Sequence, residues 1–209
     1  MRTLCGVVFL SVAVFGWSAQ AQHPSQPGVF DYYLFNLSWE PEFCRSPRNV
    51  DSEECRTGGR GFVVHGLWPQ FTRGYPQRCS YAPGLTDPST MLDLMPSTGL
   101  VQHEWMTHGT CSGLSADDYF AKLRQARSSI TIPSQLRQPA EGFSITPADL
   151  KQSFADANPG LSTDDMAVSC GNNYLTAVEI CLGKDTLRPV PCETIRDCHA
   201  NIVRVAPAR

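Results

Sequence analysis

The stretch FDYYLFNLSW, Phe30 to Trp39, is rich in aromatic residues in an alternating pattern, which predicts a β-strand with one buried face. Met166 to Cys170 and Tyr174 to Leu182 flank the turn residues Gly171-Asn172-Asn173 and predict a β-hairpin. A shorter buried strand, Gly61 to His65, is expected to run into a Gly-Leu-Trp-Pro turn. These strands favour an antiparallel sheet.

Helices are expected between the strands. Ser115 opens a helix that extends to about Arg127, with Asp118 placed to complete its N-terminal cap. Pro147 to Ala157 forms a second helix, and Thr98 to His108 also has helical character. Because helices and strands are mixed without regular alternation, the sequence predicts the α+β class, with an antiparallel central sheet flanked by several helices. We expect one disulfide-stabilised domain over residues 22–209.

The N-terminus has the pattern of an export signal. Arg2 precedes an apolar run from Leu4 to Trp17, and Ala19-Gln20-Ala21 forms a small-residue cleavage site. The run is shorter than the roughly 18 apolar residues that a membrane-spanning helix needs, which disfavours an uncleaved anchor. We therefore expect residues 1–21 to be a signal peptide, no membrane contact after its removal, and a secreted or periplasmic protein.

Cysteine usage agrees with export. Cys5 lies in the expected signal peptide, which leaves eight of the nine cysteines, and an even number is typical of disulfides in an exported chain. The eight form no paired C-x-x-C spacing, so a zinc ribbon is not expected. Spacing alone leaves about 105 pairings open. The eight residues are Cys44, Cys55, Cys79, Cys111, Cys170, Cys181, Cys192 and Cys198.

Charge limits the class of partner. The 17 basic residues include Arg2 of the expected signal, so the mature chain carries 16 basic and 20 acidic residues, and no run of Lys or Arg occurs. Proteins that follow a long nucleic-acid tract usually present a basic surface. If the ligand is a polyanion, the sequence predicts that it is held locally, over a few units.

Three of the five histidines fall in two compact stretches: His65, and the pair His103 and His108 in QHEWMTHGTC. His23 and His199 are interpreted as surface residues. Zinc proteases space two histidines four apart, in H-E-x-x-H, so that both reach one metal. Here the spacing is five, which places the two imidazoles about 140° apart around a helix. A zinc hydrolase is therefore disfavoured, and no metal or other cofactor is expected.

Glu104 and His108, four residues apart, share one helix face, and His103 can join them along a broad cleft. Cleavage of RNA by its own 2′-hydroxyl needs one group to remove the hydroxyl proton and another to protonate the departing 5′-oxygen. Imidazole suits both tasks because its pKa of about 6.5 leaves both forms available. A further histidine and a glutamate could stabilise the charged phosphorane.

Two segments, HGLWPQ (His65 to Gln70) and HEWMTHGTC (His103 to Cys111), resemble the two active-site segments of the ribonuclease T2 family. Members of this family are exported, metal-independent endoribonucleases that cut RNA through 2′,3′-cyclic phosphates. Leu37 to Trp39, Phe43-Cys44 and Glu53 to Cys55 resemble the bacterial members. The resemblance spans most of the chain beyond the expected signal, and after Cys111 it rests chiefly on the cysteines.

The resemblance implies a role for each catalytic residue. His65 would be the general acid for the 5′-oxygen and His108 the general base for the 2′-hydroxyl, although these two roles could be exchanged. His103 would bind phosphate, and Glu104 would help to stabilise the transition state. The residues implied in substrate binding are Trp68 and Tyr75, which would stack on a base, Gln70 at the first base, and Pro96 and Ser97 at the second.

Two positions depart from the family's pattern. Thr107 stands where a lysine commonly precedes the last histidine, which removes a cation near the phosphate. Gln70 stands where many members carry an acidic residue that reads the first base, and an amide both donates and accepts hydrogen bonds. The base preference of the family therefore does not carry over. Trp105 is expected in the core.

The family's pattern also implies the disulfides Cys44–Cys55, Cys79–Cys111, Cys170–Cys198 and Cys181–Cys192. The expected function is metal-independent cleavage of single-stranded RNA to 2′,3′-cyclic phosphates, followed by hydrolysis to 3′-phosphates, by a monomer with a mildly acidic pH optimum. The alternative is a secreted RNA-binding or interaction protein on the same fold, with catalysis weak or lost. Only Thr107 favours this alternative.

Overall fold

The computed structural model describes residues 25–56 and 60–208. The expected signal peptide, Cys5 and His23 lie outside the described residues. The α-helices and strands follow in the order β1 (Tyr32–Trp39), α1 (Glu40–Arg45), α2 (Glu53–Arg56), β2 (Phe62–Gln70), α3 (Thr98–Thr107), α4 (Ala116–Ser128), β3 (Phe143–Ile145), α5 (Pro147–Ala157), β4 (Met166–Gly171), β5 (Tyr174–Gly183) and β6 (Val203–Val205). Short 3₁₀ turns are η1 (Pro88–Met91), η2 (Gly109–Cys111), η3 (Ser134–Leu136) and η4 (Thr163–Asp165).

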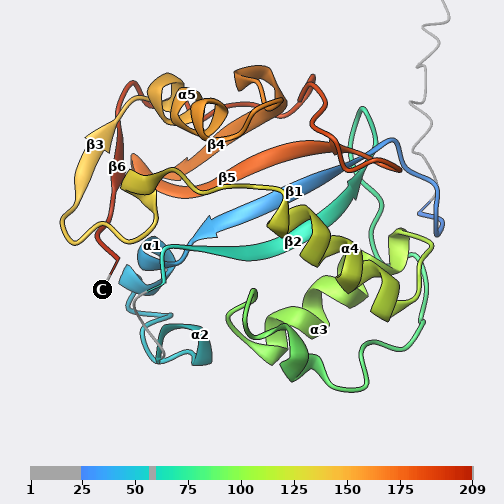
Figure 1. The fold of residues 1–209 in the computed structure, drawn as a ribbon. Helices are drawn as coiled ribbons and strands as arrows, with labels where there is room; N and C mark the ends of the chain where they lie inside the picture. The colour runs from blue at the N-terminus through green and yellow to red at the C-terminus, as the bar shows by residue number, and fades with distance from the viewer. Residues whose placement is uncertain (1–24, 57–59, 209) are drawn as a thin grey trace, which may run out of the picture.

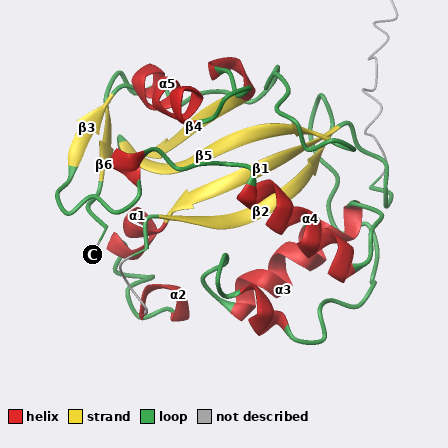
Figure 2. Cartoon of the chain, viewed as in Figure 1, coloured by secondary structure: helices red, strands yellow, loops and turns green. Residues whose placement is uncertain are grey.

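The strands form one sheet in the order β2-β1-β5-β6-β3, and β4 also pairs with β5 (Figure 1). The pairings are antiparallel except for the short contact between β5 and β6, which is parallel at Tyr174 and Arg204. Helices α3 and α4 lie on the β2 side of the sheet, and α5 lies beside β4 (Figure 2). The predicted α+β class with an antiparallel central sheet is confirmed.

Strand β1 lies between β2 and β5 and is mostly buried, which explains its aromatic and apolar sequence. Trp39 at its end is fully buried, and its indole N–H donates to the carbonyl of Ala206 at 3.0 Å. Trp105 packs on the rings of Tyr119 and Phe120 between α3 and α4, so the prediction that it belongs to the core is confirmed.

Local signals predicted the ends of several elements correctly. Ser115 caps α4 by accepting from the amide of Asp118, and α5 has the bounds that were expected. The prediction that a strand ends at His65 in a turn was wrong, because β2 continues to Gln70 and pairs with β1 along its whole length. A proline is tolerated there because β2 is an edge strand, where a missing N–H can face away from the partner.

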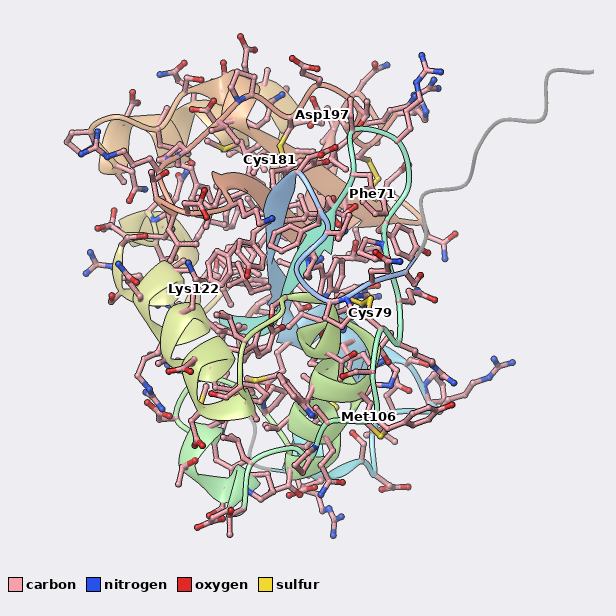
Figure 3. All side chains as sticks on the ribbon, turned by 90° about the vertical axis from the view of Figure 1, so that its right-hand side faces the viewer. Phe71, Cys79, Met106, Lys122, Cys181 and Asp197 are labelled. Carbon is pink, nitrogen blue, oxygen red and sulfur yellow. A yellow bond between two sulfur atoms is a disulfide. The ribbon has the colours of Figure 1, made fainter. Side chains whose placement is uncertain are left out.

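Four disulfides join the chain in the pairing that the resemblance implies: Cys44–Cys55, Cys79–Cys111, Cys170–Cys198 and Cys181–Cys192. The second of these connects the loop after β2 to the segment that follows α3, and Figure 3 shows Cys79 at this junction. Within the described residues, no helix is long and apolar enough to cross a membrane.

Candidate active site

A β-bulge in β2 sets the direction of His65. Leu37 of β1 lies opposite Val64 and Asn36 lies opposite Gly66, so His65 is an extra residue on β2. In a regular strand, residues three apart point to opposite faces of the sheet. The bulge shifts this alternation by one residue, and the rings of His65 and Trp68 therefore meet, with their centroids 5.4 Å apart.

His65 is held at both ring nitrogens. Its Nδ1 lies 2.9 Å from Oγ of Ser38 on the neighbouring strand, and its Nε2 lies 3.4 Å from Oε1 of Glu104 on α3. The hydroxyl of Ser38 also donates to Oδ1 of Asn36, so we assign the Nδ1 proton to His65 as the donor to Ser38. This leaves Nε2 as the nitrogen that faces Glu104.

Trp68 lies between His65 and His108 and contacts both rings. Its indole Nε1 donates to Oε2 of Glu104 at 2.6 Å, and its ring stacks on His108 with centroids 5.0 Å apart and planes at 28°. The neighbouring Gly66 is necessary for this approach. A Cβ at position 66 would lie 2.1 Å from Oε2 of Glu104 and 2.3 Å from Nε1 of Trp68. The glycine of HGLWPQ therefore makes room for the bond between β2 and α3.

Helix α3 supplies the other three residues. Glu104 is fully buried, whereas His103, one residue earlier, is exposed to solvent. His108 is the C-cap residue, with its amide donating to the carbonyl of Glu104 at 3.0 Å, and it is almost completely buried. Oε1 of Glu104 and Nδ1 of His108 have no hydrogen-bond partner among the described residues.

The environments of the partly exposed His65 and the buried His108 shift their pKa values in opposite directions. Burial disfavours the charged form of His65, but the Glu104 carboxylate, with smaller contributions from Glu54 and Glu179, outweighs burial and raises the pKa of His65 above 6.5. Burial lowers the pKa of His108 to about 4, and the nearby His103 and His65 lower it further against the attraction of Glu104. Between pH values of about 4 and about 6.5, His65 is therefore protonated while His108 is neutral.

A pocket of about 450 Å³ opens beside His108. Trp68, Gln70 and Tyr75, which were expected to contact a base, all line it, so the structure brings these three together with His108. Tyr75 is about half exposed, and its ring centroid lies 6.5 Å from that of His108. The motifs did not identify the rest of the lining, because it comes from distant segments: Leu34, Phe71, Gly74, Gln77, Glu179, Thr194 and Ile195.

Pro96 and Ser97 lie at the start of α3, outside this pocket. The hydroxyl of Ser97 accepts from the amide of Leu100 and caps the helix, so it has a structural role whether or not it contacts a base. Thr107 is buried, and its carbonyl accepts from the amide of Arg78 at 2.9 Å. The side chain at position 107 therefore brings no charge to the site.

Across the part of the chain that the structure describes, no group of three or more His, Cys, Asp and Glu side chains is arranged to hold a metal ion. The arrangement instead provides a protonated imidazole, a neutral imidazole and a buried carboxylate around one indole ring. Such a set can move protons in both directions at neighbouring atoms.

Comparison with known proteins agrees with these observations. The sequence model described as the Ribonuclease T2 family matches residues 30–192. A protein named Ribonuclease from Aeromonas hydrophila is 36% identical over 200 residues, which cover 89% of this chain and 87% of that protein. Ribonuclease I of Escherichia coli is 26% identical over 218 residues, which cover 81% of each chain.

Solved structures share the fold. RNase NT, solved in complex with 5′-AMP, matches with a TM-score of 0.70 at 25% identity, covering 86% of this chain and 99% of the other. An RNase-related protein from Calystegia sepium matches with a TM-score of 0.68 at 22% identity, and the match covers 85% of this chain and 97% of the other. The second likeness concerns the fold alone.

Proposed function

The chain belongs to the ribonuclease T2 family and is a metal-independent endoribonuclease, and we propose that His65 is its general acid and His108 its general base. The observation that carries this assignment is the opposite shift of the two pKa values. A general acid must hold a proton before the reaction and a general base must lack one. Because the pKa of His65 is raised and that of His108 is lowered to about 4, the two residues meet these requirements at mildly acidic pH.

In the first step, His108 accepts the proton of the 2′-hydroxyl as the 2′-oxygen attacks its own phosphorus. The bond from phosphorus to the 5′-oxygen breaks, and His65 protonates that oxygen from Nε2. The products are a 2′,3′-cyclic phosphate and a free 5′-hydroxyl. In the second step the roles reverse, because His65 is now neutral and His108 is protonated. His65 takes a proton from water, water attacks phosphorus, and His108 protonates the departing 2′-oxygen to leave a 3′-phosphate.

Glu104 and His103 would support these proton transfers. The Glu104 carboxylate raises the pKa of His65 and thus keeps the acid loaded before cleavage. His103 is exposed near His108, where a positive imidazole would attract the scissile phosphate and stabilise the charge that develops on its oxygens. The position and charge of Glu104 beside His65, and of His103 near His108, support these two roles.

The pocket beside His108 would hold the base on the 5′ side of the scissile phosphate. His108 accepts the proton of the 2′-hydroxyl, so the nucleotide that carries this hydroxyl must lie next to it. Trp68 and Tyr75 offer aromatic faces, and the amide of Gln70 can both donate and accept. Pro96 and Ser97 remain candidates for contact with the second base.

RNA is the substrate, and we extend the proposal to the form and place of the enzyme. Four disulfides fit an oxidising compartment, which together with the apolar N-terminal segment supports export to the periplasm or the medium. A mature N-terminus at Gln22 in the exported protein would agree with this proposal. We also expect a monomer, which sedimentation of the oxidised protein would check.

Digestion of single-stranded RNA at pH 5 to 6 in excess EDTA, with DNA alongside, tests the function. We expect 2′,3′-cyclic phosphate ends from RNA, intact DNA and no effect of EDTA. Loss of activity in EDTA would contradict the proposal. Binding of RNA without cleavage by the correctly oxidised protein would instead support a binding protein on the same fold, which no feature of the described site favours.

A further inference from the structure

Glu179 of β5 lines the pocket beside His108 that the proposed function assigns to a base. Among the described residues of this lining, it is the only one with a carboxyl group. Neither active-site motif contains it, and the proposed proton transfers do not use it. A charged group beside aromatic and apolar side chains costs free energy unless it has partners. The surroundings of Glu179 therefore indicate what it binds.

The strand pairings place Glu179 on the same face of the sheet as the reacting groups. Asn36 of β1 lies opposite Gly66 on one side and Glu179 on the other, and directly opposed residues share a face. Two residues earlier on β1, Leu34 lies opposite Trp68. Glu179 and Trp68 thus stand on strands that are two spacings apart, about 9–10 Å. Leu34, which also lines the pocket, lies on the strand between them.

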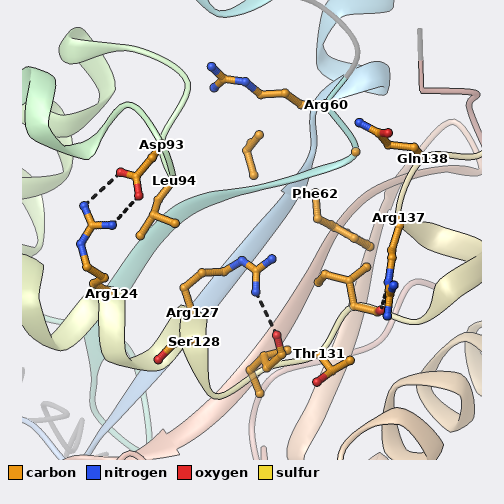
Figure 4. Close-up of a pocket in the computed structure, with 14 residues that line it drawn as sticks. Arg60, Phe62, Asp93, Leu94, Arg124, Arg127, Ser128, Thr131, Arg137 and Gln138 are labelled. Carbon is orange, nitrogen blue, oxygen red and sulfur yellow. Dashed lines mark hydrogen bonds and ion pairs between the residues drawn. The ribbon is translucent and has the colours of Figure 1, made fainter.

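A larger cavity, of about 760 Å³, lies beside the start of β2 and is lined by Phe62 and four arginines (Figure 4). Phe62 pairs with Trp39, whereas Ser38, the next residue on β1, contacts His65. Because neighbouring residues of a strand point to opposite faces, Phe62 lies on the face away from His65. The smaller pocket, with Glu179, is therefore the one of these two that opens onto the reacting groups.

Hydrogen bonds hold the carboxyl group of Glu179 in place. Nδ2 of Asn36 donates to its Oε1 at 3.2 Å, and Oδ1 of Asn36 accepts from the hydroxyl of Ser38, which fixes the direction of the amide. Burial raises the pKa of Glu179, while hydrogen bonds from Ser169 and Asn36 and the charge of His65 oppose this rise. A carboxylate can accept at about four positions, so Asn36 and Ser169 leave others for a ligand.

An ionised carboxylate only accepts hydrogen bonds, and the bases differ in what they offer to it. Guanine has two adjacent donors, N1–H and the N2 amino group, which match the two oxygens of a carboxylate as a guanidinium group does. Adenine and cytosine place an acceptor nitrogen next to their amino group, and uracil places its N3–H between two carbonyls. The carboxylate repels these acceptors. The chemistry of the pocket therefore favours guanine.

We infer that Glu179 selects guanine as the base on the 5′ side of the scissile phosphate, by accepting from N1–H and from the N2 amino group. The inference rests on the proposed function, which places that nucleotide beside His108. The rings of Trp68 and Tyr75 offer stacking surfaces to any base and give affinity without choice. Glu179 adds the choice, because a base without both donors leaves a desolvated carboxylate incompletely hydrogen-bonded.

Dinucleoside monophosphates with uridine on the 3′ side, and guanosine, inosine, adenosine, cytidine or uridine on the 5′ side, test the inference. Inosine keeps the N1–H of guanosine and lacks only the N2 amino group. The variant is Glu179→Gln, which keeps an acceptor for Asn36 and removes the charge. The matched control is Glu54→Gln, since Glu54 also acts on the pKa of His65 but lies outside the lining of the pocket.

We expect the unmodified enzyme to cleave the guanosine substrate with a kcat/KM roughly ten- to hundredfold above that for uridine, and about fivefold or more above that for inosine. In Glu179→Gln, both ratios should fall about fivefold or more. A lower pKa of His65 in the variant reduces the rates on all substrates alike and cancels in the ratios. Glu54→Gln should keep the ratios of the unmodified enzyme.

Equal cleavage of the guanosine and inosine substrates by the unmodified enzyme would overturn the inference, and this comparison needs no variant. A Glu179→Gln enzyme that keeps the guanosine preference, or that loses rate equally on every base, would overturn it as well.

Binding of 3′-GMP and of 3′-inosine monophosphate, measured by calorimetry, tests Glu179 without turnover. We expect tighter binding of 3′-GMP and loss of the difference in Glu179→Gln, and equal binding by the unmodified enzyme would overturn the inference. Selective binding of 3′-GMP by a protein that cleaves none of the dinucleosides would refute the proposed function and leave the role of Glu179 supported.

Discussion

Trp68 donates its indole N–H to Oε2 of Glu104 at 2.6 Å and thereby joins the edge strand β2 to helix α3 across the active site. The bond positions a fully buried carboxylate 3.4 Å from His65, the proposed general acid, while the face of the indole ring stacks on His108, the proposed general base. Trp68 is thus more than a surface for a base. It fixes the position of Glu104 relative to His108.

Trp68→Phe keeps an aromatic ring but removes this donor. We expect a loss of about 1–3 kcal/mol in the free energy of unfolding, because a buried carboxylate loses its hydrogen bond, together with a lower kcat. Denaturant unfolding and steady-state kinetics would measure both. Trp105→Phe is the control, since it removes an indole bond to the carbonyl of Ala82 in the core and should leave kcat largely unchanged in folded protein. Full activity of the Trp68 variant would contradict the role given to this bond.

The dependence of kcat/KM on pH should be bell-shaped, with an acidic limb at about 4 from the pKa of His108 and an alkaline limb above 6.5 from the pKa of His65. The sign follows from the roles, since the base is inactive when protonated and the acid is inactive when deprotonated. In Glu104→Gln, the carboxylate that raises the pKa of His65 is gone, and the alkaline limb should move to lower pH. An alkaline limb that stays in place while the rate falls would show that Glu104 acts by another route.

His103→Ala should move the acidic limb of the pH dependence of kcat/KM. The charge of His103 adds to burial in lowering the pKa of His108, so its removal should raise that pKa and shift the acidic limb upward from about 4. The rate should also fall, but by less than the roughly 10²–10⁴-fold expected when a general acid or base is removed, as in His65→Ala. Profiles on a dinucleoside substrate would check this. An unmoved acidic limb would mean that the charge of His103 does not lower the pKa of His108.

The bridge between Cys79 and Cys111 holds the segment that directly follows His108. Replacement of both cysteines by alanine should reduce the free energy of unfolding by about 2–4 kcal/mol. It should also lower kcat in protein that is still folded, because the C-terminal end of α3 loses its attachment to the loop after β2. Thermal unfolding and activity at a temperature well below the transition would separate the two effects. An unchanged rate in the folded variant would contradict a role in positioning the histidines.

Local chemistry explains which parts of the fold the sequence predicts. Ser115 with Asp118, and the proline that opens α5, determine where those helices begin through side chains only a few residues apart. Strands β3 and β6 have three residues each, too few for a periodic pattern, and they exist because they pair with one another and with β5. The turn expected after His65 failed for a related reason, because pairing with β1 extends β2 through Pro69.

In the active site, too, the sequence motifs predict which residues take part, whereas strand pairing and burial determine how they are arranged. HGLWPQ and HEWMTHGTC carry the three histidines and Glu104, and the structure brings His65, Glu104 and His108 together with Trp68, while His103 is exposed and acts on His108 through its charge. The bulge at His65 and the hydrogen bond to Ser38 depend on register between strands, which a single motif does not contain. The pKa values likewise depend on burial, which is a property of the assembled fold.

The central claim is that the imidazole of His65 is a proton donor and that of His108 a proton acceptor at the same pH. NMR titration of the enzyme with isotope-labelled histidine, with resonances assigned through His65→Asn and His108→Asn, measures this directly. We predict that the pKa of His65 lies above the ordinary value of about 6.5 and that of His108 near 4. A pKa of His108 equal to or above that of His65 would contradict the assignment and would exchange the acid and the base.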